Sequence, residues 1–120
     1  NTVDQGLTQM PTKSLRILIA DTDAHRALKV ERVLNDFGYY RVAPLYSREA
    51  LAGLRDAQDH DFDLLLIHQE MAGGAIVDVT EYRKDNPQFR HVLIYIDTRT
   101  LALQIGELMR AIDPSLRAGS

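Results

Sequence analysis

Short aliphatic runs alternate along the chain with longer stretches of helical periodicity. Residues 15–20, 63–68 and 92–96 each carry consecutive aliphatic side chains bounded by polar ones, a pattern typical of parallel strands buried on both faces. Residues 40–46 are rich in Tyr and Val but include Pro44, which lacks a backbone N–H donor, so this segment is predicted to be an edge strand.

Four helices are predicted between and after these strands. Asp23 is a suitable N-cap for a helix over residues 24–37, which Gly38 is placed to end. Ser47 is expected to cap a second helix that runs to about residue 57. A third helix is expected over residues 75–84, and the apolar spacing of residues 99–112 predicts a fourth.

The resulting order βαβαβαβα predicts an α/β fold, a doubly wound parallel sheet in a three-layer sandwich. Residues 15–113 would form this one domain, with a disordered leader over 1–14 and a tail over 114–120. Because such sheets carry function at the carboxyl ends of their strands, the candidate site residues are the polar ones at those ends: Asp21, Thr22, Asp23, His68, Asp97 and Thr98.

Composition narrows the function classes. The chain has 17 acidic and 14 basic residues and no cysteine, which argues against a broad nucleic-acid footprint and excludes disulfides and thiolate chemistry within it. Its apolar runs are far shorter than the roughly 20 residues that cross a bilayer. We therefore expect a cytoplasmic protein with no direct nucleic-acid or membrane partner.

Three segments together resemble the receiver domain of bacterial two-component response regulators: LRILIADTDAHR, DFDLLLIHQEM and HVLIYIDT. The resemblance covers roughly residues 15–112, and it implies a flavodoxin-like sheet with strand order 2-1-3-4 and a fifth strand beyond. In that family an acidic pair after strand 1 holds Mg²⁺, an aspartate after strand 3 accepts phosphate, and a hydroxyl and a lysine follow strands 4 and 5.

Four of these positions depart from the family pattern. The resemblance puts His68 at the phosphoacceptor position and Thr22 at the second acidic position, which displaces the next carboxylate to Asp23. The hydroxyl position falls on Ile96 by the motif or on Thr98 by residue counting. The lysine has no match, because the sequence ends where a fifth strand should begin. Phosphoryl transfer and Mg²⁺ binding need those oxygen ligands and that cation, so we predict no enzyme activity, no stable acyl phosphate and weak or absent Mg²⁺ binding.

Several residues allow more than one interpretation. His68 could accept phosphate itself, could be protonated beside Asp21, or could be a neutral histidine bonded to nearby groups. Glu70 either overlooks the pocket or is a solvated loop carboxylate. Tyr95 either acts as a rotameric switch, as the resemblance implies, or packs in the core. Gly73 and Gly74 favour loop geometry over a phosphate cradle, and the spacing of the four histidines, His25, His60, His68 and His91, does not favour zinc.

The fifth strand bears on the expected partners. If it is absent, the strand over residues 92–96 is an open sheet edge that a partner must cover. We expect a switch and interaction face on Tyr95 and the last helix. The partner at this face would be a second copy of the chain, in a homodimer, or another signalling protein. A shortened chain is the competing explanation for the missing strand. The residues assigned to this helix face are Leu101, Ile105, Leu108 and Met109.

The leading prediction is therefore a phosphorylation-independent receiver domain that acts as a protein-interaction or dimerisation module in two-component signalling. One alternative is a working phospho-switch that uses His68 or a neighbouring carboxylate such as Asp21. The other is a small-molecule or nucleotide binder at the strand-end crevice.

Overall fold

The computed structural model describes residues 14–57, 62–74 and 77–113. Of residues 55–57 it describes the backbone but not the side chains. His60, most of the expected leader and the expected tail lie outside these ranges. The described residues form four strands and five helices in this order: β1 (Ile17–Ala20), α2 (Ala24–Asp36), β2 (Val42–Leu45), α3 (Arg48–Ala57), β3 (Phe62–His68), α4 (Gln69–Ala72), α5 (Val79–Asp85), β4 (Phe89–Tyr95) and α6 (Leu101–Ile112).

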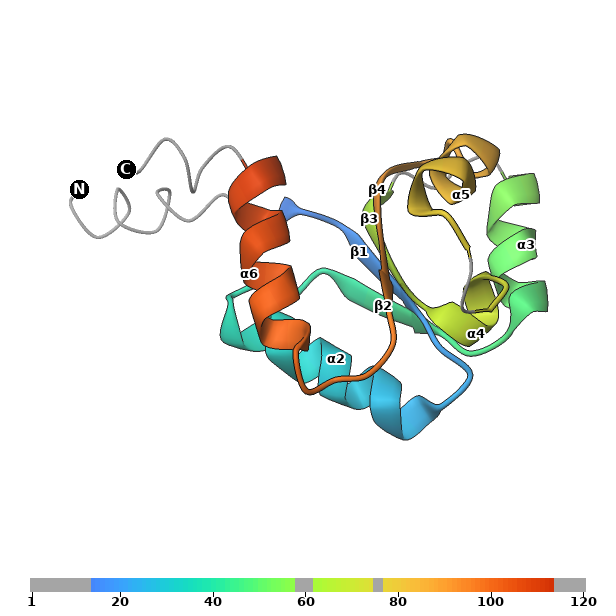
Figure 1. Ribbon diagram of the computed structural model, residues 1–120. Coiled ribbons are helices and arrows are strands. Elements are labelled where there is room, and N and C mark those ends of the chain that lie inside the picture. The colour runs from blue at the N-terminus through green and yellow to red at the C-terminus, as the bar shows by residue number, and fades with distance from the viewer. Residues whose placement is uncertain (1–13, 58–61, 75–76, 114–120) are drawn as a thin grey trace.

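The strands form a single parallel sheet in the order β2-β1-β3-β4 (Figure 1). This arrangement confirms the predicted α/β doubly wound fold and its strand order, and it is consistent with a receiver-like flavodoxin fold. It also confirms that the strand with Pro44 lies at an edge, where Pro44 pairs with Ile19. The opposite edge of the described sheet is β4.

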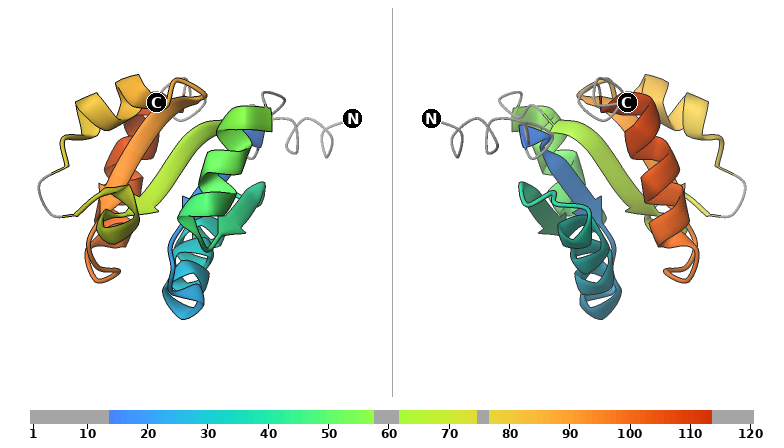
Figure 2. Two further views of the ribbon diagram at one scale, coloured as in Figure 1. Left: turned by 90° about the vertical axis from the view of Figure 1, so that its right-hand side faces the viewer. Right: turned by 90° about the vertical axis from the view of Figure 1, so that its left-hand side faces the viewer.

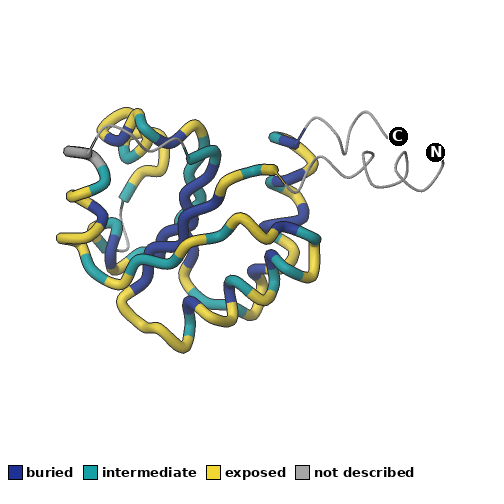
Figure 3. Tube along the Cα trace, turned by 180° about the vertical axis from the view of Figure 1, so that it is seen from behind, coloured by how far each residue is buried: buried dark blue, intermediate teal, exposed yellow. Residues whose placement is uncertain are grey.

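Helices cover both faces of the sheet, with α2 and α6 on one face and α3, α4 and α5 on the other (Figures 1 and 2). Alternate residues of the central strands supply the two cores: Ile17 and Ile19 pack toward α2 and α6, whereas Leu18 and Ala20 pack toward α3. This alternation follows from the two-residue period of a strand. The buried residues accordingly concentrate along the strands (Figure 3).

The ends of α2 and α3 agree with the sequence-based predictions. The Asp23 carboxylate accepts hydrogen bonds from the backbone N–H groups of His25 and Arg26 at the start of α2. Gly38 follows the helix with a φ of 94°, a left-handed conformation that glycine adopts at little cost. The Ser47 hydroxyl accepts a hydrogen bond from the N–H of Ala50 in the first turn of α3.

The helix expected over residues 75–84 was wrong in its extent. The structure instead has the four-residue α4 directly after β3 and the separate α5 over Val79–Asp85. Gly73 ends α4 with a φ of 129°, and the Asp78 carboxylate starts α5 by accepting from the N–H of Thr80. Local capping groups therefore set the helix bounds in this part of the chain.

The last strand begins earlier than expected. β4 starts at Phe89, three residues before the predicted start at residue 92. Phe89 is buried, and its ring lies 6.2 Å from the ring of Phe62 at the start of β3. The aromatic contact extends the pairing of the two strands to their first residues.

The apolar stripe of α6, assigned above to the interaction face, packs in the core. Leu101, Ile105 and Met109 are fully buried against the sheet and α2, and Leu108 is half-buried beside them. An amphipathic helix turns its apolar face toward the nearest core. The exposed apolar side chain of this helix is Leu103.

Candidate functional site

The carboxyl ends of three strands bring three of the candidate residues together. Asp21 follows β1, His68 ends β3, and Tyr95 ends β4 directly opposite His68 in the register of the sheet. All three side chains are buried. We call the cluster of Asp21, His68 and Tyr95 at these strand ends the crevice.

Asp21 is saturated by groups of the protein itself. The Arg26 guanidinium donates two hydrogen bonds to its carboxylate, Nε to Oδ2 and Nη2 to Oδ1, both at 2.7 Å. The Tyr95 hydroxyl donates to Oδ2 at 2.6 Å, and the backbone N–H of Asp23 donates to Oδ1 at 2.9 Å. Each carboxylate oxygen therefore already accepts two hydrogen bonds.

These contacts set the charge states in the crevice. Burial by itself would raise the pKa of Asp21, but the hydrogen bonds from Arg26 and Tyr95 outweigh it and hold that pKa below its ordinary value. Burial and the hydrogen bond to Asp21 raise the pKa of Tyr95 well above that of a free tyrosine. Asp21 is thus an anion whose charge Arg26 neutralises, and Tyr95 is a neutral hydrogen-bond donor.

Arg26 was missed by sequence reasoning, although its position carried a signal. It lies five residues after Asp21, in the first turn of the helix that follows β1, and its side chain returns over the end of that strand. An arginine this close to a strand-end carboxylate can form a two-point hydrogen bond with it.

His68 is held by the backbone on both ring nitrogens. Its Nδ1 accepts a hydrogen bond from the N–H of Glu70 at 3.2 Å, which makes it the cap of α4. Its Nε2 lies 2.8 Å from the carbonyl oxygen of Ile96, which can only accept. This pair of partners fits a neutral imidazole with its proton on Nε2. The ring also lies edge-on to the Tyr95 ring, with centroids 5.4 Å apart.

The remaining candidate residues lie around the crevice. Thr22, Asp23 and Glu70 are exposed, and Thr98 is half-buried. Glu70 places its Oε1 3.9 Å from Nδ1 of His68. The side chain of Ile96 is exposed, so this residue contributes its carbonyl oxygen to the crevice instead of a hydroxyl. Asp97 accepts the backbone N–H of Arg99 in the loop before α6.

The crevice does not fit the magnesium ion that a receiver would hold. Mg²⁺ needs several oxygen ligands in an octahedron, whereas the buried carboxylate is occupied by Arg26 and the central position is an imidazole. Among the described residues, no cluster of three or more His, Asp or Glu side chains is arranged to hold a metal ion.

An open hollow of about 340 Å³ lies beside the crevice, between the residues that follow β1 and β2, the start of α3, and α4. Thr22 and Glu70 belong both to this hollow and to the candidate residues. The remaining lining residues are Tyr46, Ser47, Arg48, Glu49 and Met71. Arg48 donates through Nη2 to the carbonyl oxygen of Glu70, which ties the two sides of the hollow together.

A second buried tyrosine–aspartate pair lies at the other end of the α2 and α6 layer. The hydroxyl of Tyr39, after α2, donates to Oδ2 of Asp113, after α6, at 2.6 Å. Burial and this hydrogen bond raise the pKa of Tyr39. The two residues are 74 positions apart, and the sequence offered no pattern from which their contact could be read.

Comparison of the chain with models of protein families, with curated proteins and with solved structures found no match. In the part of the chain that the structure describes, no helix is both long enough and apolar enough to cross a membrane.

Proposed function

We propose that the chain is an atypical receiver-like domain that acts as a phosphorylation-independent interaction module in bacterial two-component signalling, in the cytoplasm. The fold, the order of the strands and the polar residues at the strand ends support this proposal, together with the sequence resemblance to receivers. Under this proposal the crevice residues have no catalytic role and the domain needs no cofactor.

The observation that carries the proposal is the double hydrogen bond between Arg26 and Asp21. A receiver uses the carboxylate after its first strand to hold a divalent cation, which neutralises the incoming phosphoryl group. Here a fixed guanidinium supplies the positive charge, and it cannot coordinate a phosphoryl oxygen and the carboxylate as a metal ion does. The ion pair of Arg26 and Asp21 in the crevice is therefore structural.

His68 supports the same proposal. As a neutral imidazole bonded to Glu70 N–H and Ile96 C=O, it has no ring nitrogen left for a phosphoryl donor. Phosphorylation on this side chain would break either the bond that links the end of β3 to Ile96 after β4 or the bond that caps α4. The alternative of a phospho-switch through His68 is therefore the weaker candidate.

The proposed partner is a protein of the same signalling pathway or a second copy of the chain. We place the contact on the free edge of β4 and the outer surface of α6, where Ile96 and Leu103 are exposed. Apolar side chains that stay exposed around an unpaired strand are typical of a protein contact.

Binding of a small molecule or nucleotide is the second candidate function. The hollow of about 340 Å³ beside the crevice favours it, since ligands of doubly wound sheets bind at the carboxyl ends of the strands. A panel of nucleotides and nucleosides, each tested for its effect on the melting temperature, separates this candidate from the interaction module. A clear stabilisation by one of them that Arg48→Ala abolishes would establish it.

The proposal is tested by exposing the full chain to acetyl phosphate and Mg²⁺ and measuring its intact mass. We expect the mass to stay that of the unmodified chain. His68→Gln and His25→Gln serve as matched variants, because His25 is an exposed histidine outside the crevice. A phosphate adduct that His68→Gln removes and His25→Gln retains would overturn the proposal in favour of the phospho-switch.

A further inference from the structure

We infer that the outer edge of β4 takes up an extended segment of a partner protein, which adds to the sheet as a strand with aliphatic side chains and an acidic residue at its beginning. This inference deepens the proposed function, because it names the partner segment of the interaction module. Five features of the edge support it.

The two edges of the described sheet are built differently. β2 has four residues, and its Pro44 cannot donate a backbone hydrogen bond to an added strand. β4 has seven residues, with no proline, and six of them pair with β3. Edges that are short or carry proline resist added strands, so β4 is the edge that can accept one.

The backbone of β4 offers regularly spaced groups to such a strand. The N–H of Leu64 on β3 donates to the carbonyl oxygen of Arg16, on the side of β1. Backbone groups of successive residues point to opposite edges, so those of Leu65 point to β4, where Leu65 lies opposite Val92. In a parallel pair, Leu65 then bonds to the residues on either side of Val92. The N–H and C=O groups of Val92 and Ile94 therefore point away from β3, toward the outer edge of the sheet.

Helix α5 leaves room beside this edge. It packs chiefly on β4, on the face of the sheet that α3 and α4 also cover (Figure 2). Two hollows of about 330 and 250 Å³ lie along β4 and share Val79 and Val92. We call their joint lining the β4 groove: Gln69, Gly74, Val77, Val79, Thr80, Arg83, His91, Val92, Leu93, Ile94, Ile96 and Leu108.

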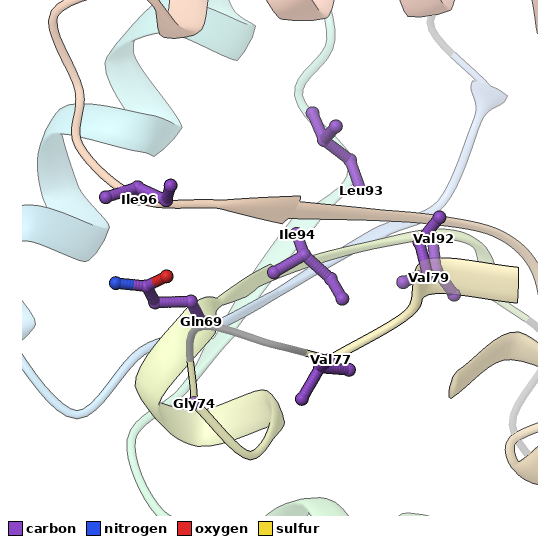
Figure 4. Close-up of a pocket in the computed structure, with 8 residues that line it drawn as sticks. All are labelled: Gln69, Gly74, Val77, Val79, Val92, Leu93, Ile94 and Ile96. Atoms are coloured by element: carbon purple, nitrogen blue, oxygen red, sulfur yellow. The ribbon is translucent and has the colours of Figure 1, made fainter. Parts of the chain in front are cut away.

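The walls of the β4 groove are mostly aliphatic. Ile94 points from β4 toward the segment that carries Val77 (Figure 4), and Val79 and Val92 line the same hollow. Leu93 points to the other face of the strand, toward the side of α6, where Leu108 also lines the groove. An added strand would thus meet aliphatic side chains on both of its faces, as the inner strands of this sheet do.

Charge distinguishes one end of the β4 groove. Arg83 on α5 lines the end near the start of β4, and its Nη1 donates to the carbonyl oxygen of Arg90 at 3.3 Å. His91 beside it has a lowered pKa, because burial and the positive charge of Arg83 disfavour its protonation. The cation at this end is therefore Arg83, which complements a carboxylate.

β3 shows the sequence pattern that a strand paired with β4 can have. Its Asp63 accepts the backbone N–H of Arg16 and lies 3.9 Å from Nη1 of Arg90 on the neighbouring strand. A run of four buried aliphatic residues follows Asp63. A parallel strand on the other side of β4 that began with an acidic residue would place its carboxylate near Arg83 in the same way.

A segment of a partner protein fits better than the edge of a second copy. In a symmetric pair of β4 edges, two copies of α5 would meet on the same face of the joined sheet. Because α5 packs on β4, both copies of this helix would crowd the joined edge. A single extended segment meets only one copy of α5.

The test uses the full chain labelled with ¹⁵N and the peptide Ac-Glu-Val-Thr-Val-Thr-Val-NH2. We expect chemical-shift changes confined to β4, α5 and the facing part of α6. Hydrogen exchange of the Val92 and Ile94 amides should slow by about tenfold or more when the peptide binds, since each gains a hydrogen-bond partner.

Two matched pairs of variants locate the binding site. Val79→Lys should weaken peptide binding about tenfold by placing a charge in the apolar hollow, whereas Leu28→Lys should not, since Leu28 is equally exposed, at 42%, but lies on α2. Arg83→Glu should favour a peptide that begins with Lys by about threefold over the one that begins with Glu. Lys84→Glu, one residue further along α5, should leave that preference unchanged.

Two results would overturn the inference. One is the absence of shift changes at β4 at millimolar peptide. The other is protection of the Val92 and Ile94 amides that grows with protein concentration when no peptide is present, because a second copy would then fill the groove. Either result leaves the phosphorylation test of the proposed function unaffected, so the two proposals can fail separately.

Discussion

The crevice and the β4 groove lie at the same sheet but satisfy their polar groups in opposite ways. In the crevice, the carboxylate of Asp21 and both nitrogens of His68 are bonded to groups of the same chain. Along the β4 groove, the outward backbone groups of Val92 and Ile94 have no strand partner in the described sheet. The first region is complete without a ligand, and the second is completed by one.

This difference separates two roles that a receiver-like fold can have. Polar groups that are fully bonded inside the protein contribute to its stability and are costly to rearrange. An unpaired edge contributes little to stability and is free to bind. Substitutions in the crevice should therefore change folding, and substitutions in the groove should change binding.

The largest effect is expected for the buried charge. Asp21→Ala removes the partner of Arg26 and of the Tyr95 hydroxyl, so we expect the free energy of unfolding to fall by about 3 kcal/mol. Urea denaturation measures this change. Asp23→Ala is the matched control: it removes only the cap of α2 and should cost about 1 kcal/mol. Equal losses for the two variants would mean that the crevice is no special source of stability.

A smaller loss is expected for the tyrosine hydroxyl of the crevice. Tyr95→Phe removes one hydrogen bond to a charged carboxylate while keeping the buried ring, and we expect it to lower the free energy of unfolding by about 2 kcal/mol. Tyr39→Phe, which removes the hydrogen bond to Asp113 at the other end of the layer, provides the comparison. If Tyr95→Phe left the free energy of unfolding unchanged, Arg26 alone would satisfy Asp21.

The pH dependence of stability should reveal the same ion pair. The pKa of Asp21 is lowered in the folded protein, so its contribution is present above the unfolded value of about 4 and is lost as the pH falls through the folded value. Below about pH 4, urea midpoints of the unmodified chain should therefore fall more steeply than those of Asp21→Asn. Parallel acid profiles would contradict a charged Asp21.

The smallest effect on stability is expected in the β4 groove. Val79→Lys and Leu28→Lys change half-exposed aliphatic residues on different helices, and each should shift the free energy of unfolding by less than about 0.5 kcal/mol. Thermal denaturation of the two variants checks this expectation. A large loss for Val79→Lys would mean that the groove wall is part of the core, and its effect on peptide binding would then have a different cause.

The architecture could be predicted from the sequence because its signals are local and repeated. The aliphatic run Leu64–Ile67 has no polar face, which only a central strand tolerates, and Pro44 could only be accommodated at an edge. The caps Asp23 and Ser47 are also local signals, and both act at the predicted helix starts.

The crevice could be predicted only in part, because its contacts join residues distant in sequence. The strand ends indicated that Asp21 and His68 would meet, but the arginine that neutralises Asp21 comes from the next helix. The contact of Tyr95 with Asp21 spans 74 residues and depends on the register of two strands that are not neighbours. No periodicity encodes such a contact.

The helix at residues 75–84 was mispredicted for a further physical reason. Val77 and Val79, which lie inside the predicted helix, line the β4 groove together with Gly74. His68 caps the separate helix α4 before this segment, and Asp78 caps α5 within it. A histidine cap depends on a free ring nitrogen, which the sequence does not reveal.

The most direct test of the account is an NMR titration of the ¹⁵N-labelled chain with Mg²⁺ followed by beryllofluoride, which mimics a bound phosphoryl group. We predict that the amide signals of Asp21, Asp23 and His68 stay in place at both steps, because Arg26 already occupies the carboxylate. Saturable shifts of these three signals with Mg²⁺ alone, or a second set of signals with beryllofluoride, would contradict the account.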